Sequence, residues 1–199
     1  HDRFAYQDYC AVQQSGIHTV RDGLRWHLIE KSPGEYDFSS WLPMLEAASR
    51  AGVEVMWDLF HFGWPDFIDV FSTEFVERYA SFANAAARVL RIETSGTRFL
   101  APSNEISFLA WAGGDKGFIF PHEERRGDEV KRQLVRAAGA FGQHRLEVVE
   151  VRRVASATLI GDGCCHLSVD HPFLGPQASN PSRWQTCGGL EAADEPDQE

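Results

Sequence analysis

The sequence has little cysteine, no long apolar run and a shortage of positive charge, and each of these excludes a class of protein. Four cysteines among 199 residues are too few and too scattered for a secreted domain framed by disulfides, so we expect a reducing, cytoplasmic location. No apolar run approaches the roughly 20 residues that span a bilayer, so we expect no membrane partner. Nineteen Lys and Arg against 29 Asp and Glu give a net charge of −10. Nucleic-acid binding relies on clustered basic side chains, so we expect no nucleic-acid partner.

The rest of the composition is that of a globular protein with many aromatic rings. Hydrophobic residues make up 43% and charged residues 24% of the chain, which is ordinary usage. The rings comprise 14 Phe, 6 Trp and 4 Tyr. The length suits one domain, or part of a larger one, with a substantial core.

Helix and strand patterns alternate over the first 113 or so residues. The predicted order is the end of a helix over 8–15, closed by Gly16, a strand over 17–26, a helix from Ser39 or Ser40 to Gly52, a strand over 53–60, a helix capped by Ser72 and a strand over 99–101. A further helix is predicted beyond this region, over 127–141. Strands separated by such helices indicate parallel βαβ units. We therefore expect an α/β fold of the (β/α)8 TIM-barrel type, comprising about the first half of the barrel.

The pattern weakens further along the chain. We expect residues 1–140 to form the partial barrel and residues 141–199 to be an irregular tail, either disordered or non-native, as a frameshifted or mis-spliced translation would produce. Cys164, Cys165 and His166 invite a zinc interpretation. Adjacent cysteines are poor partners for one tetrahedral ion, however, and the chain has no C-x-x-C pair, so we expect no metal and no cofactor.

Polar and aromatic residues gather where three predicted strands end, which is where (β/α)8 barrels carry their chemistry. The first strand contributes Arg21 and Trp26, the second Asp58 and the segment 61–65, and the third the pair 104–105. Each motif alone is ordinary, since an Arg is usually a surface charge and Asn-Glu pairs occur by chance. In this order, at successive strand ends, the three are far more specific.

These motifs resemble those of glycoside hydrolase family 1, in the large clan of retaining (β/α)8 β-glycosidases. That family has an Arg followed five residues later by a Trp, as Arg21 and Trp26 are here. Its next strand ends in His-Trp-x-x-Pro, which residues 61–65 follow with Phe62 in place of the Trp. Its third motif is Asn-Glu, kept at 104–105 without the usual flanking Thr and Pro. The resemblance extends over about residues 8 to 113.

The resemblance implies hydrolysis of O-glycosyl bonds, of the β-glucosidase or β-galactosidase type, by retaining double displacement. Such chemistry needs two carboxyl groups about 5–5.5 Å apart, one an acid/base and the other a nucleophile. Glu105 would be the acid/base, and Asn104 would hydrogen-bond the sugar 2-hydroxyl. Arg21 would lie near the nucleophile and keep it ionised. His61 would bind another hydroxyl of the sugar.

Two tryptophans could offer a flat apolar face to a pyranose ring, Trp64 and Trp111. Core packing is an equal alternative for Trp111. Three further tryptophans are expected in the core: Trp26, Trp41 and Trp57.

Structural alternatives remain for the polar residues. Glu105 can be a solvated surface group, whereas Arg21 and His61 can be hydrogen-bonded structural residues at the barrel mouth. Asp58 can support His61 through a hydrogen bond.

The nucleophile of that family is a Glu on the seventh strand, and a complete barrel takes about 250 residues, so we assign no nucleophile here. We expect a glycoside hydrolase-like protein that is inactive as this fragment and whose partner is a carbohydrate with a terminal β-linked sugar. The alternative is a non-catalytic barrel remnant that binds carbohydrate. These residues do not determine which sugar is recognised.

Overall fold

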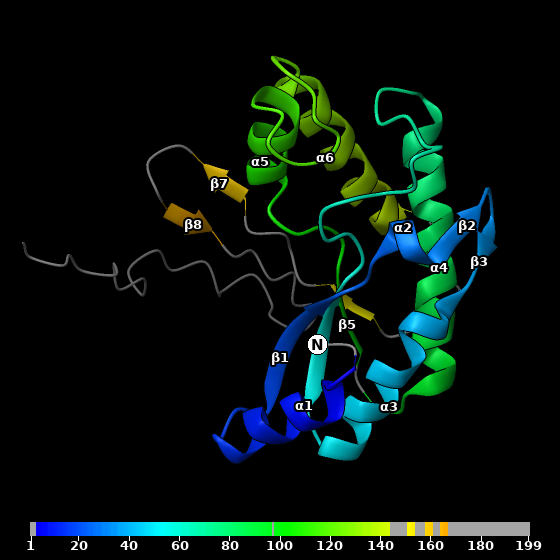
Figure 1. Cartoon of the computed structure of the whole chain (residues 1–199), viewed down its shortest axis with the longest axis vertical. Helices are drawn as coiled ribbons and strands as arrows, with labels where there is room; N and C mark the ends of the chain where they lie inside the picture. The colour runs from blue at the N-terminus through cyan, green and yellow to red at the C-terminus, as the bar shows by residue number, and fades with distance from the viewer. Residues whose placement is uncertain (1–2, 97, 144–150, 154–157, 161–163, 167–199) are drawn as a thin grey trace, which may run out of the picture. The chain divides into compact units, whose positions relative to one another are not determined.

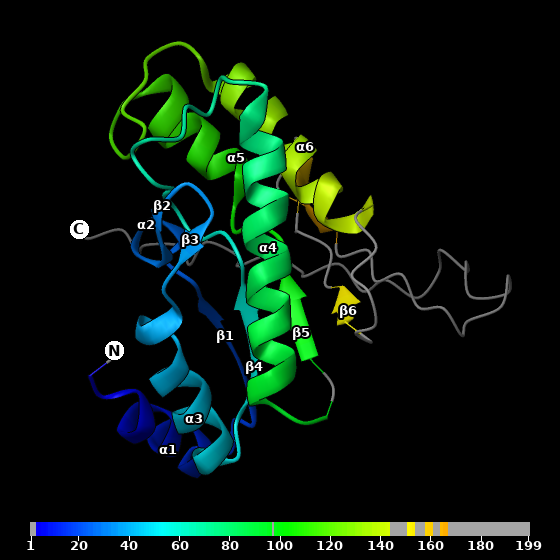
Figure 2. The same cartoon turned by 90° about the vertical axis from the view of Figure 1, so that its right-hand side faces the viewer.

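The computed structural model describes residues 3–96, 98–143, 151–153, 158–160 and 164–166, and after residue 141 it describes the backbone alone. Four strands form a parallel sheet in the order β1–β4–β5–β6. Figure 1 shows the whole chain, and Figure 2 labels all four of these strands. Their bounds are β1 Thr19–Gly23, β4 Glu54–Asp58, β5 Arg98–Ala101 and β6 Val151–Arg153. Parallel neighbours joined through helices confirm the predicted α/β class.

The longer helices lie between or beside these strands in the predicted order. They are α1 Ala5–Gln14, α3 Leu42–Ala51, α4 Glu74–Glu93 and α6 Gly127–Gln143. Shorter elements are the helices α2 Trp26–Ile29 and α5 Ile106–Leu109, the 3-10 turn η1 Phe38–Ser40 and the π-helix η2 Ala110–Asp115. Two antiparallel pairs complete the list, β2 Glu30–Ser32 with β3 Glu35–Tyr36, and β7 Thr158–Ile160 with β8 Cys164–His166.

Several predicted boundaries need correction. The strand expected over 17–26 is shorter, because the chain turns after Gly23 and Trp26 opens helix α2. Neither Ser39 nor Ser40 caps α3; the Asp37 carboxylate accepts from the Ser39 backbone N–H and begins the η1 turn instead. Helix α4 begins after Thr73 rather than after Ser72. The two predicted helix ends at Gly16 and Gly52 are confirmed, with Gly52 at φ +68°.

Apolar residues recur at helical spacing along α4, and the face that they form is buried. Its inward residues are Phe75, Tyr79, Phe82, Ala83 and Ala86, each no more than 1% exposed. Figure 2 shows α3 and α4 lying over one side of β1 and β4. This side of the sheet is therefore where the core forms.

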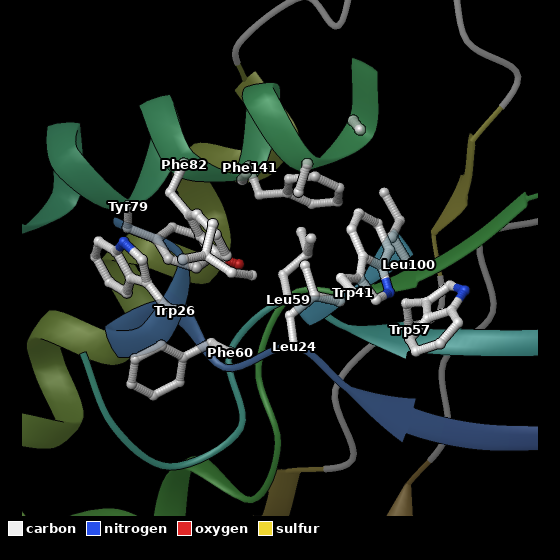
Figure 3. Close-up of a cluster of buried hydrophobic side chains, with 14 of the residues drawn as sticks. Leu24, Trp26, Trp41, Trp57, Leu59, Phe60, Tyr79, Phe82, Leu100 and Phe141 are labelled. Atoms are coloured by element: carbon white, nitrogen blue, oxygen red, sulfur yellow. The ribbon is translucent and has the colours of Figure 1, made fainter. Parts of the chain in front are cut away.

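Trp26 lies within that core, under α4 (Figure 3). Its ring centroid lies 5.2–6.1 Å from four other rings, those of Phe60, Phe75, Tyr79 and Phe82. The indole Nε1 donates to Glu30 over 2.6 Å. Glu30 is 1% exposed, and it also accepts from the Gly34 N–H and lies 3.6 Å from Arg78. A buried carboxylate needs such partners to offset its lost hydration.

Trp41 and Trp57 pack edge to face, with centroids 5.4 Å apart. Both are 2% exposed, and Trp26 is fully buried. The prediction that these three tryptophans belong to the core is confirmed.

The strand register divides the sheet residues between two faces. Trp57 pairs with Leu100, and both lie on the helix-covered face, fully or almost fully buried. Met56 pairs with Arg21 on one side and Phe99 on the other, so these three share the opposite face. That face is only half-buried. Within the described residues, no helix has the length and apolar character needed to cross a bilayer.

Candidate functional site

The carboxyl ends of β1, β4 and β5 meet at one edge of the sheet. Backbone hydrogen bonds continue the alignment past the strands, from Leu24 N to Asp58 O (2.9 Å), from Leu59 N to Ala101 O (2.8 Å) and from Asn104 N to Phe60 O (2.8 Å). The three motifs singled out in the sequence therefore lie side by side, as expected for parallel strands that end together.

A cluster of three charged or titratable side chains, the Arg21–Asp58–His61 triad, lies at this edge. Arg21 Nε donates to Asp58 Oδ1 over 2.7 Å, and His61 Nδ1 lies 3.1 Å from Asp58 Oδ2. The Asp58 side chain is 1% exposed, whereas those of Arg21 and His61 are 46% and 44% exposed. Asp58 thus anchors Nε of Arg21 and Nδ1 of His61, while both side chains remain partly exposed.

Glu105 follows β5 and directly precedes α5, in a left-handed backbone conformation with φ +40° and ψ 55°. A residue with a side chain adopts this conformation at a cost of order 1 kcal/mol, and such strain tends to concentrate at functional sites. Its side chain is exposed, and its carboxylate has no hydrogen bond or ion pair among the described residues. Asn104 beside it is 8% exposed. The strained turn therefore places a free carboxylate next to a buried amide.

Trp64 does not lie where a sugar could stack on it. It is 2% exposed, with its ring 5.6 Å from Phe60, 5.4 Å from Phe75 and 4.7 Å from Phe120. Its Nε1 donates to the Ile68 carbonyl over 3.0 Å. Because neighbouring rings enclose it and its polar atom is satisfied internally, Trp64 is a core residue. We leave it out of the binding set.

Trp111 has the opposite environment, 46% exposed on the π-helix η2. It is part of an aromatic row made of the partly buried Phe62 and the exposed Phe108, Trp111 and Phe118, whose successive centroids are 5.6, 5.9 and 5.9 Å apart. The row begins beside the triad, because the Phe62 and His61 rings are 5.0 Å apart. From the sequence, Trp111 alone in this row was predicted to stack on a sugar, and Phe62 was noted only as part of the 61–65 motif. The other members lie on separate elements, and no periodic pattern links them.

The π-helix that carries Trp111 is joined closely to the start of α6. A Cβ added to Gly114 would lie 2.8 Å from the Gly127 Cα, so only a residue without a side chain fits there. The Asp115 carboxylate accepts from the Gly127 N–H over 2.7 Å. This glycine joint fixes how η2, which carries Trp111, packs against the start of α6.

Tyr79 supports the β5 end from the core side. Its hydroxyl donates to the Pro102 carbonyl, two residues before Asn104. Burial, aided by the negative charge of Asp58, raises the pKa of Tyr79 above its ordinary value. The phenol therefore stays protonated and remains a hydrogen-bond donor to this strand end.

The described residues contain no group of three or more His, Cys, Asp or Glu that could hold a metal ion. The side chains of Cys164, Cys165 and His166, which prompted the zinc interpretation, lie outside the part of the chain described in side-chain detail.

Comparison with known proteins gives matches among solved structures alone. No family model matches the chain, and no curated protein matches it either. An enzyme described as AHE from Alicyclobacillus herbarius is 18% identical, with a TM-score of 0.69 over 77% of this chain and 36% of its own. A β-glucosidase from Thermotoga maritima, in complex with a substituted glucoimidazole, is 14% identical, with a TM-score of 0.68 over 78% and 37%. A rice β-glucosidase is 15% identical, with a TM-score of 0.61 over 70% and 34%.

These matches establish the fold. The chain spans about a third of the length of the solved structures it matches, and it has the parallel α/β arrangement of part of a TIM barrel. The predicted fold class is confirmed, and the fold relationship is with β-glucosidases. The domain boundary near residue 140 stays a prediction, although the backbone of β6 at 151–153 pairs with β5 as the fourth strand of the sheet.

Proposed function

We propose that this chain carries part of the sugar-binding and acid/base machinery of a retaining β-glycosidase. The observation that carries the proposal is the alignment of the three motif-bearing strand ends by backbone hydrogen bonds. The similar structures include β-glucosidases in complex with a glucoimidazole and in a covalent complex with glucose. A carbohydrate with a terminal β-linked sugar is therefore the proposed ligand.

Each site residue has a role that suits its environment. Glu105, exposed and without a partner among the described residues, is the proposed acid/base that protonates the leaving oxygen. Asn104 beside it is the proposed hydrogen-bond donor to the sugar 2-hydroxyl. Arg21 and His61, each with about half of its side chain exposed, are proposed to bind further hydroxyls. Trp111 offers the proposed stacking face.

One observation favours binding without turnover as a second candidate. The resemblance implies that Arg21 lies beside a catalytic nucleophile, yet the carboxylate that accepts a hydrogen bond from Arg21 Nε is that of Asp58. Asp58 is 1% exposed, so it cannot reach an anomeric carbon in a ligand. Retaining hydrolysis needs a second accessible carboxylate. Without one, the same edge would bind sugar and release it unchanged.

The test uses the full chain with an aryl β-glucoside for turnover and glucoimidazole for binding, the latter measured by calorimetry. Turnover that falls at least a hundredfold in Glu105→Gln, but not in the exposed control Glu46→Gln, would support the enzyme. Glucoimidazole binding without turnover, weakened in Trp111→Ala, would support the second candidate. A chain that neither binds glucoimidazole nor hydrolyses the glycoside would overturn both.

A further inference from the structure

The Arg21–Asp58–His61 triad has a fixed arrangement of hydrogen-bond donors and acceptors, which the roles proposed above do not use. Asp58 presents one oxygen to each neighbour, Oδ1 to Arg21 and Oδ2 to His61. A carboxylate accepts hydrogen bonds only, and a guanidinium donates only. The bond from Arg21 therefore occupies one oxygen and leaves the other to accept from His61.

We propose that Asp58 is a positioning residue, which holds His61 as the tautomer with its proton on Nδ1 and leaves Nε2 as a bare acceptor. The ordinary alternative, with the proton on Nε2, would put two lone pairs against each other across 3.1 Å. No described residue forms a hydrogen bond with Nε2. The free nitrogen is therefore available to an incoming group, and the 44% exposure of the side chain gives that group access.

Gly23 provides the space that this arrangement needs. It pairs with Asp58 across the β1–β4 ladder, and a Cβ at Gly23 would lie 2.8 Å from the His61 Cβ and 2.9 Å from its Nδ1. Atoms at these distances overlap, so the His61 ring can lie against β1 only because residue 23 lacks a side chain. Gly23 of β1 and Asp58 of β4 together therefore determine where the His61 ring lies.

The tautomer determines what the edge recognises. A bare Nε2 accepts a hydrogen bond, so it selects a ligand group that donates, such as a hydroxyl. Arg21 uses Nε for Asp58 and retains its terminal nitrogens, which have no partner among the described residues and which donate. The pair thus suits a diol in which one hydroxyl donates to His61 while the next accepts from Arg21. This last step rests on the proposed function, whereas the tautomer itself does not.

Substitution of Asp58 by Asn should reverse the tautomer while keeping the shape. The amide has one oxygen and one NH2 group, and Arg21 can only donate, so the oxygen must face Arg21. The NH2 group then faces His61 and donates to Nδ1. The imidazole proton is forced onto Nε2, where it meets the ligand as a donor.

The experiment is a long-range ¹H–¹⁵N correlation spectrum of the full chain with ¹⁵N-labelled histidine, recorded without ligand at about pH 8, above the ordinary His pKa of about 6.5. His61→Gln identifies the signal by its loss. Protonated Nδ1 and bare Nε2 are expected for the native chain, and the reverse for Asp58→Asn. The control Asp37→Asn removes an equal charge at an exposed cap and should leave the His61 signals unchanged.

A native spectrum with bare Nδ1, or with both nitrogens protonated, would overturn the proposal, as would an unchanged tautomer in Asp58→Asn. If that variant does not fold, Gly23→Ala replaces it, because the added methyl group displaces the ring. Mixed tautomers in Gly23→Ala support the proposal, and a single protonated Nδ1 contradicts it. Glucoimidazole binding should weaken about three- to tenfold in Asp58→Asn, the effect of one hydrogen bond. Failure of this binding step alone would count against the sugar site and not against the tautomer.

Discussion

Two neighbouring regions of this chain differ in whether their polar side-chain atoms have hydrogen-bond partners. In the aromatic core under α4, Trp26 Nε1 bonds to Glu30, Trp64 Nε1 to the Ile68 carbonyl and the Tyr79 hydroxyl to the Pro102 carbonyl. At the strand-end edge, the described residues leave the Glu105 carboxylate, His61 Nε2 and the terminal nitrogens of Arg21 without partners. Internal partners indicate a role in stability, and accessible unpaired groups indicate a role toward a ligand.

The two candidate tryptophans give the largest expected contrast between these regions. Trp64→Ala should lower the free energy of unfolding by about 3–5 kcal/mol, because it opens a cavity among three rings and strips the Ile68 carbonyl of its donor. Trp111→Ala should cost less than about 1 kcal/mol, because its ring is 46% exposed. Urea unfolding followed by circular dichroism measures both. Equal losses would show that Trp111 is a core residue too.

The strained residue at the strand-end edge gives a smaller effect of opposite sign. Glu105→Gly should raise the free energy of unfolding by about 1 kcal/mol, because glycine adopts a φ of +40° without the steric cost that a side chain brings. Glu105→Ala is the matched control, which removes the carboxylate and keeps the Cβ, so its stability should stay near the native value. If Ala stabilises as much as Gly, charge rather than backbone strain is responsible.

An effect that is seen only at alkaline pH concerns Tyr36, at the border of the core. Burial, followed by the negative charge of Glu30, raises its pKa from 10.0 to about 12. The folded chain then holds this proton more tightly than the unfolded chain. The resulting stability is complete below about pH 10 and is lost as the pH rises from 10 toward 12.

Alkaline titration followed by near-ultraviolet absorbance should show one phenol that ionises near pH 12. Tyr36→Phe should remove that step and flatten the fall in stability over the same interval. A step unchanged in Tyr36→Phe would assign it to another tyrosine.

Much of the fold could be predicted because its signals are local. Apolar residues at helical spacing mark α4, and the inward residues expected from that spacing are buried. The strand ends were found because parallel strands place their terminal residues at one edge. The helix starts were misplaced because neither helix uses a serine cap: α3 begins after Trp41 and α4 after Thr73, both without a side-chain cap.

The site was harder to predict because its decisive features depend on contacts between distant residues. The sequence does not distinguish Trp64 from Trp111, because only the packing of the folded chain shows which ring is enclosed and which is exposed. The bond between Arg21 and Asp58 spans 37 positions. It emerges only when the β1–β4 register is known, since that register places both side chains on the same face of the sheet.

The glycine joint between η2 and α6 separates what can vary from what cannot. Trp111, Phe108 and Phe118 have 42–68% of their surface open, so their identity is free to change with little loss of stability. Gly114 and Gly127 admit no such freedom, because a methyl group added at Gly114 would overlap the Gly127 Cα and one added at Gly127 would overlap the Asp115 carboxylate. A laboratory library that randomises the three rings and leaves both glycines intact would therefore vary the proposed stacking surface without changing the backbone that carries it.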